Sequence, residues 1–234
     1  MIRALLTIDD VSSKNTPAIV DFLNEKKIPV IMFMVGQWAE DYPEQLIYAL
    51  RNGVIVGNHS YTHPEFSKLS FEECKSEIDK NEDVLDRFYD RAGVERKYRL
   101  FRFPYGDKGG ANKPHIQEYL SEKAFDKVDD TWLPYPWWKE KGLDKDIDTL
   151  WTFDFGEYNI RPDSGFTLDD VMKRIYDMSP DNDAPLLKDG SSHILLLHAH
   201  DETEELLPKY YSIFIEELLK NGVEFTAPAF MRRQ

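Results

Sequence analysis

The stretch that decides the fold is residues 2–10, IRALLTIDD, in which an apolar run leads directly into two adjacent carboxylates, Asp9 and Asp10. The run predicts a first β-strand. Short apolar runs of this kind recur along the chain and alternate with helical patterns, which indicates a parallel sheet built from βα units. The expected strands lie near residues 2–8, 29–34, 53–56, 98–101, 125–128, 149–153, 193–197 and 223–226.

Local signals place several helix boundaries between these strands. Thr16-Pro17 is typical of a helix start with a first-turn proline, and Asn52-Gly53 and Asn221-Gly222 are typical of left-handed helix ends. The longest helical pattern covers residues 71–91. Residues 129–148, rich in Trp, Tyr and Pro, interrupt the βα rhythm and are interpreted as an inserted loop.

Size and composition narrow the classes of protein. The 234 residues suit one catalytic domain over residues 1–234. A net charge of -14 excludes phosphate-backbone binding as the main activity, and no apolar run is long enough for a membrane span, so neither nucleic acid nor membrane is expected as a partner. A neutral substrate such as a sugar remains open. The single Cys74 and the lack of a visible export signal lead us to expect a cytoplasmic location.

Polar side chains follow the predicted strands at their carboxyl ends, where the sites of parallel barrels are found. They are Asp9 and Asp10, His59 and His63, Arg102, Asp154 and His198. Two imidazoles four residues apart, with one carboxylate, make an open three-ligand site for Zn²⁺ or a similar divalent ion, and the second carboxylate is then free to act as a base. Without the other residues, the Asp pair and the His pair would be ordinary loop residues.

Five stretches in order resemble the polysaccharide deacetylases, carbohydrate esterase family 4. They are TIDD at residues 7–10, GNHSYTHP at 57–64, FRFPYG at 101–106, WTFD at 151–154 and LLLH at 195–198. The resemblance covers essentially the whole chain. It implies a distorted (β/α) barrel of about seven parallel strands and one divalent metal ion, first Zn²⁺, with Co²⁺ or Ni²⁺ as alternatives.

The resemblance also implies roles for individual residues. Asp9 would be the catalytic base, and Asp10 would bind the metal together with His59 and His63. His198 would be the general acid that protonates the leaving group.

Further positions match the family's supporting residues. Arg102 would hold Asp9 ionised, and Asp154 would orient His198, with Glu157 as a possible substitute. The backbone N–H of Tyr105 would help to bind the oxyanion, and Leu196 would form part of the acetyl pocket. His200 receives no role, because it is expected to point to the opposite side of a continued strand.

The sequence departs from the family pattern at three positions. Val11 replaces a Gly, Phe103 replaces a Pro, and Tyr158 replaces a Trp in the pocket wall. None of the three removes a catalytic group, so these changes bear on substrate preference more than on activity.

The expected reaction is removal of an acetyl group from a carbohydrate, first an N-acetylated amino sugar polymer or oligomer of the chitin or peptidoglycan kind. Alternatives are an O-acetyl xylan esterase, a hydrolase of small C–N substrates and a non-catalytic sugar-binding protein. The oligomeric state stays open. The aromatic rings of Trp132, Tyr135, Trp137 and Trp138 would either plug the barrel or stack on sugar rings.

Overall fold

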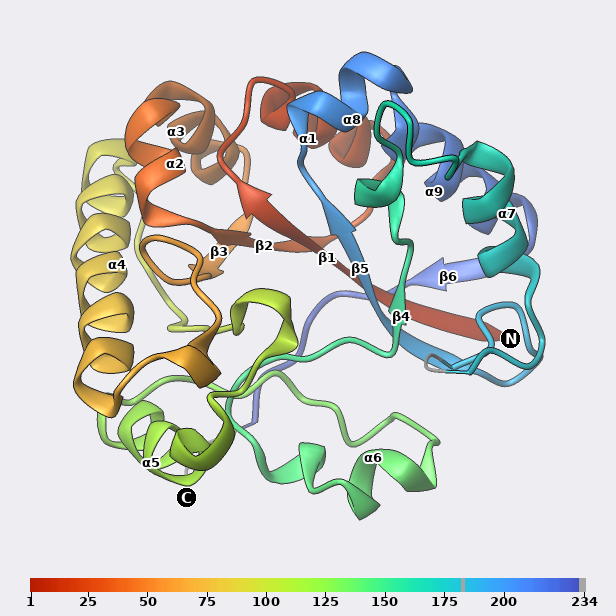
Figure 1. Ribbon diagram of the computed structural model, residues 1–234. Helices are drawn as coiled ribbons and strands as arrows, with labels where there is room; N and C mark the ends of the chain where they lie inside the picture. Colours follow the sequence, from red (N-terminus) through yellow and green to blue (C-terminus); the bar gives the residue numbers. More distant parts are fainter. Residues whose placement is uncertain (182–183, 232–234) are drawn as a thin grey trace.

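The computed structural model describes residues 1–181 and 184–231, and within them six strands form one sheet in the order β3-β2-β1-β5-β4, with β6 also paired to β1 (Figure 1). The strands are β1 (Ile2–Val11), β2 (Val30–Met34), β3 (Ile55–Asn58), β4 (Phe153–Asp154), β5 (Ser192–His198) and β6 (Val223–Phe225). Every pairing between these strands is parallel. The predicted α/β fold with a parallel sheet is confirmed.

The helices occupy the connections between the strands. They are α1 (Thr16–Lys26), α2 (Gly36–Asp41), α3 (Pro43–Arg51), α4 (Phe71–Ala92), α5 (Lys113–Glu122), α6 (Pro136–Glu140), α7 (Leu168–Tyr176), α8 (Asp201–Leu206) and α9 (Tyr210–Lys220). The predicted boundaries at Thr16-Pro17, Asn52-Gly53 and Asn221-Gly222 agree with α1, α3 and α9. No helix in the described ranges is long and apolar enough to cross a membrane.

Strand β1 lies at the centre of the sheet because it pairs with three others. Residues Arg3 to Asp9 pair with β5, the later part of β1 pairs with β2, and its first three residues pair with β6. The register places Asp9 beside His198 on β5. Two chemically active residues that are far apart in sequence are therefore neighbours on adjacent strands.

Backbone hydrogen bonds through two short extended segments close the sheet into a distorted barrel. Beyond β3, Arg102 N donates to Asn58 O at 3.0 Å, and Thr149 N donates to Phe101 O at 2.9 Å. Thr152 N then donates to Ile194 O of β5 at 2.9 Å. Residues 100–102 and 149–154 thus span the gap between β3 and β5.

The predicted strands at residues 98–101 and 125–128 are wrong as regular strands. The first contributes one parallel bridge, between Phe101 and Asn58, and the second one antiparallel bridge, between Val128 and Phe230. Each segment has only two buried apolar residues, Leu100 and Phe101 in the first and Phe125 and Val128 in the second, and each has too few ladder partners to continue a strand.

Alternate residues of β1 serve two different cores, as the two-residue period of a strand requires. Ala4, Leu6 and Ile8 belong to the larger core between the sheet and the helices. Leu5 points into the barrel, where it packs in a second cluster with Leu133 and Trp138. Farther along the same inward face, Asp9 lines a cavity at the carboxyl ends of the strands.

The aromatic segment at residues 129–148 plugs the barrel at the end opposite this cavity. Leu133, Trp138 and Leu143 are buried in the inner cluster, against which Trp132 and Trp137 also pack. The Tyr135 hydroxyl lies 3.3 Å from His193 Nε2, near the start of β5. Because none of these residues lines the cavity, the structure supports the plug and not the sugar-stacking alternative.

Replacing Trp138 with Ala is expected to destabilise the fold by about 3–5 kcal/mol, the usual range for a buried Trp. Trp138 is 3% exposed, and its Nε1 donates to Asp130 Oδ2 at 2.8 Å. Chemical denaturation measures the loss. Tyr48→Ala, at an exposed position, is the control with little change, and an equal loss there would contradict the assignment.

Candidate active site

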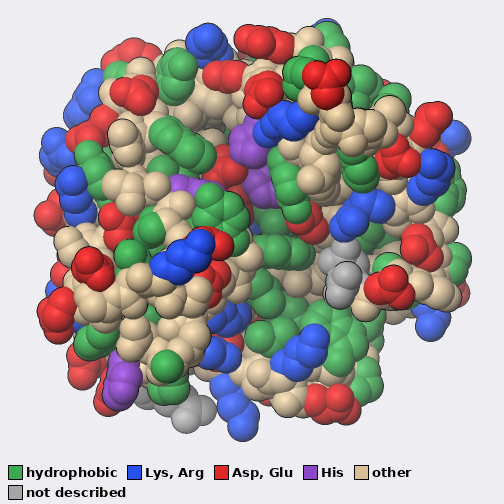
Figure 2. All heavy atoms as spheres, in the orientation of Figure 1, with side chains coloured by type: hydrophobic (Ala, Val, Ile, Leu, Met, Phe, Trp, Pro, Cys, Tyr) green, Lys and Arg blue, Asp and Glu red, His purple; other side chains and the backbone are tan. Residues whose placement is uncertain are grey.

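A cavity of about 400 Å³ opens at the carboxyl ends of the strands. Its wall consists of Asp9, Asp10, Trp38, His59, His63, Tyr105, Trp151, Asp154, Tyr158, Leu196, His198 and His200. In Figure 2 several histidines gather in a hollow of the surface beside acidic and hydrophobic side chains, and another lies apart at the lower left. The structure thus brings together every site residue expected from the sequence, with Arg102 buried behind the wall.

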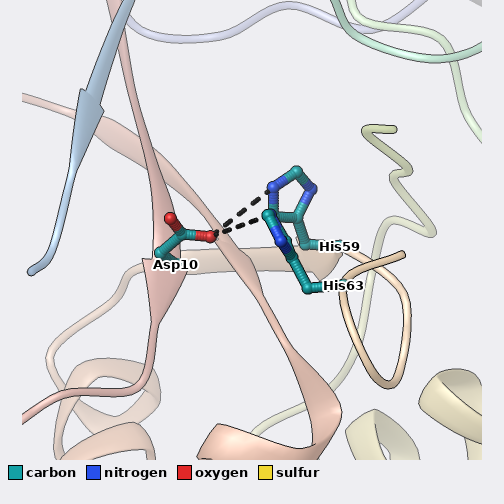
Figure 3. A group of neighbouring side chains, drawn as sticks. All are labelled: Asp10, His59 and His63. Carbon is teal, nitrogen blue, oxygen red and sulfur yellow. Dashed lines mark ion pairs between the residues drawn. The ribbon is translucent and has the colours of Figure 1, made fainter. Parts of the chain in front are cut away.

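Asp10, at the end of β1, faces two histidines from the loop after β3 (Figure 3). Its Oδ1 lies 3.7 Å from His59 Nε2 and 3.3 Å from His63 Nε2. Asp10 is 6% exposed, and Oδ1 has no hydrogen-bond partner among the described residues. Two imidazole nitrogens therefore converge on a buried carboxylate oxygen that no hydrogen bond among the described residues satisfies, which makes three ligand atoms in all.

The local environment leaves both imidazoles ready to bind a metal through Nε2. His59 Nδ1 lies 2.8 Å from the Arg102 carbonyl, which can only accept, so Nδ1 carries the proton and Nε2 keeps its lone pair. Burial lowers the pKa of His63 to about 4, and repulsion from the His59 ring in its charged form adds to this effect. The His63 ring is therefore neutral at neutral pH. Trp38 and Tyr105 pack on its two sides, with ring centroids 5.5 Å and 4.6 Å away.

The histidine loop is held by a buried amide beneath it. Asn58 Oδ1 accepts from Ser60 N at 2.8 Å, and its Nδ2 donates to Ile78 O at 3.0 Å and Glu82 Oε1 at 2.9 Å, both on α4. Asn58 therefore fixes the start of the histidine loop to α4.

The donor set fits a divalent ion such as Zn²⁺, since two neutral imidazoles and one carboxylate are its usual ligands. Burial by itself raises the pKa of Asp10, but the hydrogen bond to His200 and the nearby imidazoles outweigh it and hold that pKa well below the usual range. Asp10 is therefore ionised, as a metal ligand must be.

Asp9 points into the same cavity and pairs with a fully buried arginine. Arg102 Nη1 donates to Asp9 Oδ1 at 2.8 Å and to Thr7 Oγ1 at 2.7 Å, while its Nε donates to Thr149 O at 2.8 Å. The guanidinium also lies over the Phe33 ring, 4.4 Å from its centroid. This bracing fixes the carboxylate, with its Oδ2 3.4 Å from His59 Nε2.

His198, at the end of β5, donates hydrogen bonds to a carboxylate in the loop after β4. Glu157 Oε1 lies 3.1 Å from His198 Nδ1 and accepts from the His198 backbone N–H at 2.6 Å. Asp154, expected in this role, instead accepts from Gly156 N and from the Tyr158 hydroxyl. The substitute named in the sequence analysis, Glu157, therefore orients His198, and Asp154 remains a nearby wall residue.

Replacing Glu157 with Gln is expected to lower kcat by about 10²-fold, the lower end for acid–base groups. Burial alone lowers the pKa of His198, but the Glu157 carboxylate raises it to about 10. Because the folded pKa exceeds the ordinary 6.5, the pair stabilises the fold fully below that value, and this stabilisation disappears as pH rises through about 10.

An NMR titration of the metal-free protein measures the pKa of the His198 ring. In the Glu157→Gln variant the ring should lose its proton at a clearly lower pH than in the wild type. Asp154→Asn is the matched control, because it removes a neighbouring carboxylate and leaves the Glu157 contact intact. A larger effect on His198 from Asp154→Asn than from Glu157→Gln would return the orienting role to Asp154.

Aromatic side chains form much of the remaining wall. The Tyr158 ring packs against His198 with centroids 4.8 Å apart, and Leu196 lies beside it on β5. Tyr105 has a φ of 58° and a side chain that is 65% exposed at the rim. Trp38 and Trp151 were not predicted, although Trp38 follows the second strand and the strand-end rule could have found it.

The interpretation of His200 as a residue facing away from the site is wrong. Strand β5 ends at His198, and Ala199 N donates to Asp9 O as the chain turns into α8. Residues two apart on a strand share a face, so His200 lies on the cavity side with Leu196 and His198, and its Nε2 lies 2.6 Å from Asp10 Oδ2.

The fold and cavity define a parallel α/β barrel with a site of imidazoles and carboxylates at its strand ends. A family model described as polysaccharide deacetylase matches residues 2–121. This is just over half of the chain, and the chain belongs to the polysaccharide deacetylase family. The matched region includes Asp9, Asp10, His59, His63 and Arg102, whereas His198 lies beyond it.

Curated relatives share part of the sequence. A peptidoglycan-N-acetylglucosamine deacetylase of Bacillus cereus is 34% identical over 103 residues, which are 44% of this chain and 36% of that protein. A chitooligosaccharide deacetylase of Azorhizobium caulinodans is 30% identical over 102 residues, 43% of this chain and 47% of that protein. The matched stretch therefore covers less than half of either relative.

Solved structures resemble the whole fold. A structure of a peptidoglycan N-acetylglucosamine deacetylase, in complex with 4-naphthalen-1-yl-N-oxidanyl-benzamide, has a TM-score of 0.65 at 21% identity. The match covers 96% of this chain and 85% of that one. A family 4 carbohydrate esterase from Streptomyces lividans, in complex with acetate, has a TM-score of 0.61 at 21% identity, covering 94% and 90%. At this identity the likeness shows the fold.

Proposed function

We propose that the protein removes acetyl groups from a carbohydrate with the help of one divalent metal ion, first Zn²⁺, with Co²⁺ or Ni²⁺ as alternatives. The observation that carries the proposal is the convergence of Asp10, His59 and His63 next to the braced pair Asp9–Arg102, in one cavity with His198. The family membership supports the same chemistry.

Asp10 Oδ1, His59 Nε2 and His63 Nε2 would hold the ion. When bound, such an ion acts as a Lewis acid and lowers the pKa of water. Asp9 would then accept the proton of the attacking water, because its carboxylate is held in place by Arg102 and faces the cavity. Fixed contacts on the carboxylate reduce the reorganisation that proton transfer needs.

His198 is placed to protonate the departing nitrogen or oxygen. The raised pKa described above keeps the ring protonated, and Glu157 Oε1 occupies its Nδ1 side, so Nε2–H is the proton that can be donated. The β1–β5 register brings Asp9 and His198 side by side. Asp9 can therefore act on the water that attacks the acetyl carbon, and His198 on the nitrogen or oxygen that leaves it. The Tyr105 N–H and the Leu196 side chain are proposed to contact the oxyanion and the acetyl methyl group.

The substrate we propose first is an N-acetylated amino sugar polymer or oligomer, since relatives are named as deacetylases of peptidoglycan, chitin and chitooligosaccharides. O-acetyl xylan is the second candidate, within the same acetyl-removing chemistry. A non-catalytic sugar-binding protein is the third. A hydrolase of small C–N substrates is the fourth.

Acetate release separates these four alternatives. Purified protein is incubated with N-acetylchitooligosaccharides, peptidoglycan, acetylated xylan and small amides, each with and without a chelator. We expect chelator-sensitive acetate release from the amino sugar substrates. Release from xylan alone or from small amides alone would select the corresponding alternative, and no release from any substrate after metal loading would overturn the proposal.

A further inference from the structure

His200 and Arg161 form a chain of contacts that ends on the proposed metal ligand Asp10. His200 Nε2 lies 2.6 Å from Asp10 Oδ2, and Arg161 Nη2 lies 3.3 Å from His200 Nδ1. Both residues also line a second cavity of about 280 Å³, which shares Asp10, Trp38 and His200 with the first. His200 thus contacts the second oxygen of the Asp10 carboxylate, and His59 and His63 lie near the first.

The chemistry of the guanidinium fixes where the His200 proton sits. Arginine has N–H donors and no acceptor, so His200 Nδ1 must accept the hydrogen bond and carry no proton. The remaining proton of the neutral ring is then on Nε2, from which it is donated to Asp10 Oδ2. Arg161 therefore selects the one neutral tautomer that can hold Asp10.

We propose that Arg161 and His200 are positioning residues that hold the Asp10 carboxylate with Oδ1 turned toward His59 and His63. The inference rests on the proposed metal site. His200 is not itself assigned as a ligand, because among the described residues the close group of donor atoms is made by Asp10, His59 and His63. His200 instead occupies the second oxygen of the same carboxylate.

Asp10 needs such a contact because of where it lies. Its backbone has a φ of 64°, in the left-handed region, at the point where β1 ends. Its Oδ1 has no hydrogen bond among the described residues that could fix the torsion of the carboxylate. The His200 hydrogen bond to Oδ2 supplies that constraint. Contacts of this kind from outside the ligand set are known to orient metal ligands.

Arg161 is itself held firmly enough to act as the anchor. Its Nη1 donates to Ile160 O at 3.0 Å and to Thr203 Oγ1 at 3.1 Å, and its Nε lies 3.0 Å from Glu202 Oε2. The guanidinium is thus bound to the start of α8 and to the loop after Tyr158. It has a fixed position from which to bind His200.

The neighbouring Asp201 provides a matched control. Its two carboxylate oxygens accept from Lys14 N and Asn15 N, each at 3.1 Å, and so tie the loop after β1 to α8. Replacing Asp201 loosens the same two segments without removing a contact to Asp10. A general structural role of this region and a specific role of His200 are therefore separable.

The first measurement is Zn²⁺ affinity by competition with a chromophoric chelator. His200→Ala is expected to weaken binding by about 10- to 100-fold, the range for partners outside the ligand set. His200→Gln should restore most of the affinity, because its amide N–H can replace Nε2–H. Asp201→Ala should lower the melting temperature and leave the affinity near that of the wild type.

The second measurement is the ¹⁵N NMR tautomer of His200 in the metal-free protein. The wild type should show protonated Nε2, and Arg161→Met should give a mixture of tautomers. Wild-type Zn²⁺ affinity in His200→Ala, a Gln variant no better than Ala, or a protonated Nδ1 in the wild type would each overturn the inference while leaving the proposed function standing. A wild-type protein that binds no Zn²⁺ would overturn both.

Discussion

Replacement of Asp9 with Asn is expected to reduce kcat by about 10⁴-fold, the upper end of the range for general acid–base groups. The reason is that Asn keeps the size of the side chain and loses the basic oxygen that faces the cavity. Bound metal should remain, because Asp10, His59 and His63 are unchanged. Kinetics on an acetylated oligosaccharide and metal content per chain are measured together.

The same substitution also removes the negative partner of the buried Arg102, so its effect on stability needs a control. Thr7→Val removes another hydrogen bond to Arg102 Nη1 and keeps the Asp9 carboxylate. This variant should retain most of its activity even where its melting temperature falls. Substantial turnover by the folded Asp9→Asn protein would mean that another group, such as Asp154, is the base.

Replacement of His63 with Ala is expected to reduce metal affinity by more than about 100-fold, since even residues outside the ligand set contribute 10- to 100-fold. His63 supplies one of the three donor atoms, together with His59 and Asp10. The other described histidine of the same loop, His59, is already part of this set and cannot replace it. Activity should fall with the metal. Zn²⁺ titration and elemental analysis measure the loss.

His115→Ala serves as the matched control, because His115 is exposed on α5 and lies outside the cavity. Its metal content and activity should equal those of the wild type. Wild-type metal content in His63→Ala would remove His63 from the ligand set and leave the proposed site without a third donor.

The larger part of the fold could be predicted from local patterns. The apolar runs at β1, β2 and β5 predict strands because a long strand pairs along most of its length, as β1 does with β5. The runs at 98–101 and 125–128 failed because burial, which apolar residues report, does not ensure a pairing partner along the whole run. Sequence alone cannot distinguish these two cases.

The site residues that directly follow a strand could be predicted from the sequence. Asp10, His59 and His63 converge because parallel strands bring their carboxyl ends to one face. Glu157 required the coordinates, because its contact depends on how the loop after β4 leaves its strand. His200 did not, because residues two apart on a strand share a face, so counting from His198 places His200 toward the cavity, and the expectation of the opposite face misapplied this period.

The separation of the aromatic plug from the cavity has a consequence for protein engineering. Residues 129–148 close one end of the barrel, and the cavity opens at the other. Mutations at sites without shared contacts usually combine additively. A library that diversifies the plug can therefore be selected for heat tolerance first and combined with cavity variants selected separately for substrate, provided that it spares the contacts to Phe33, on which Arg102 lies.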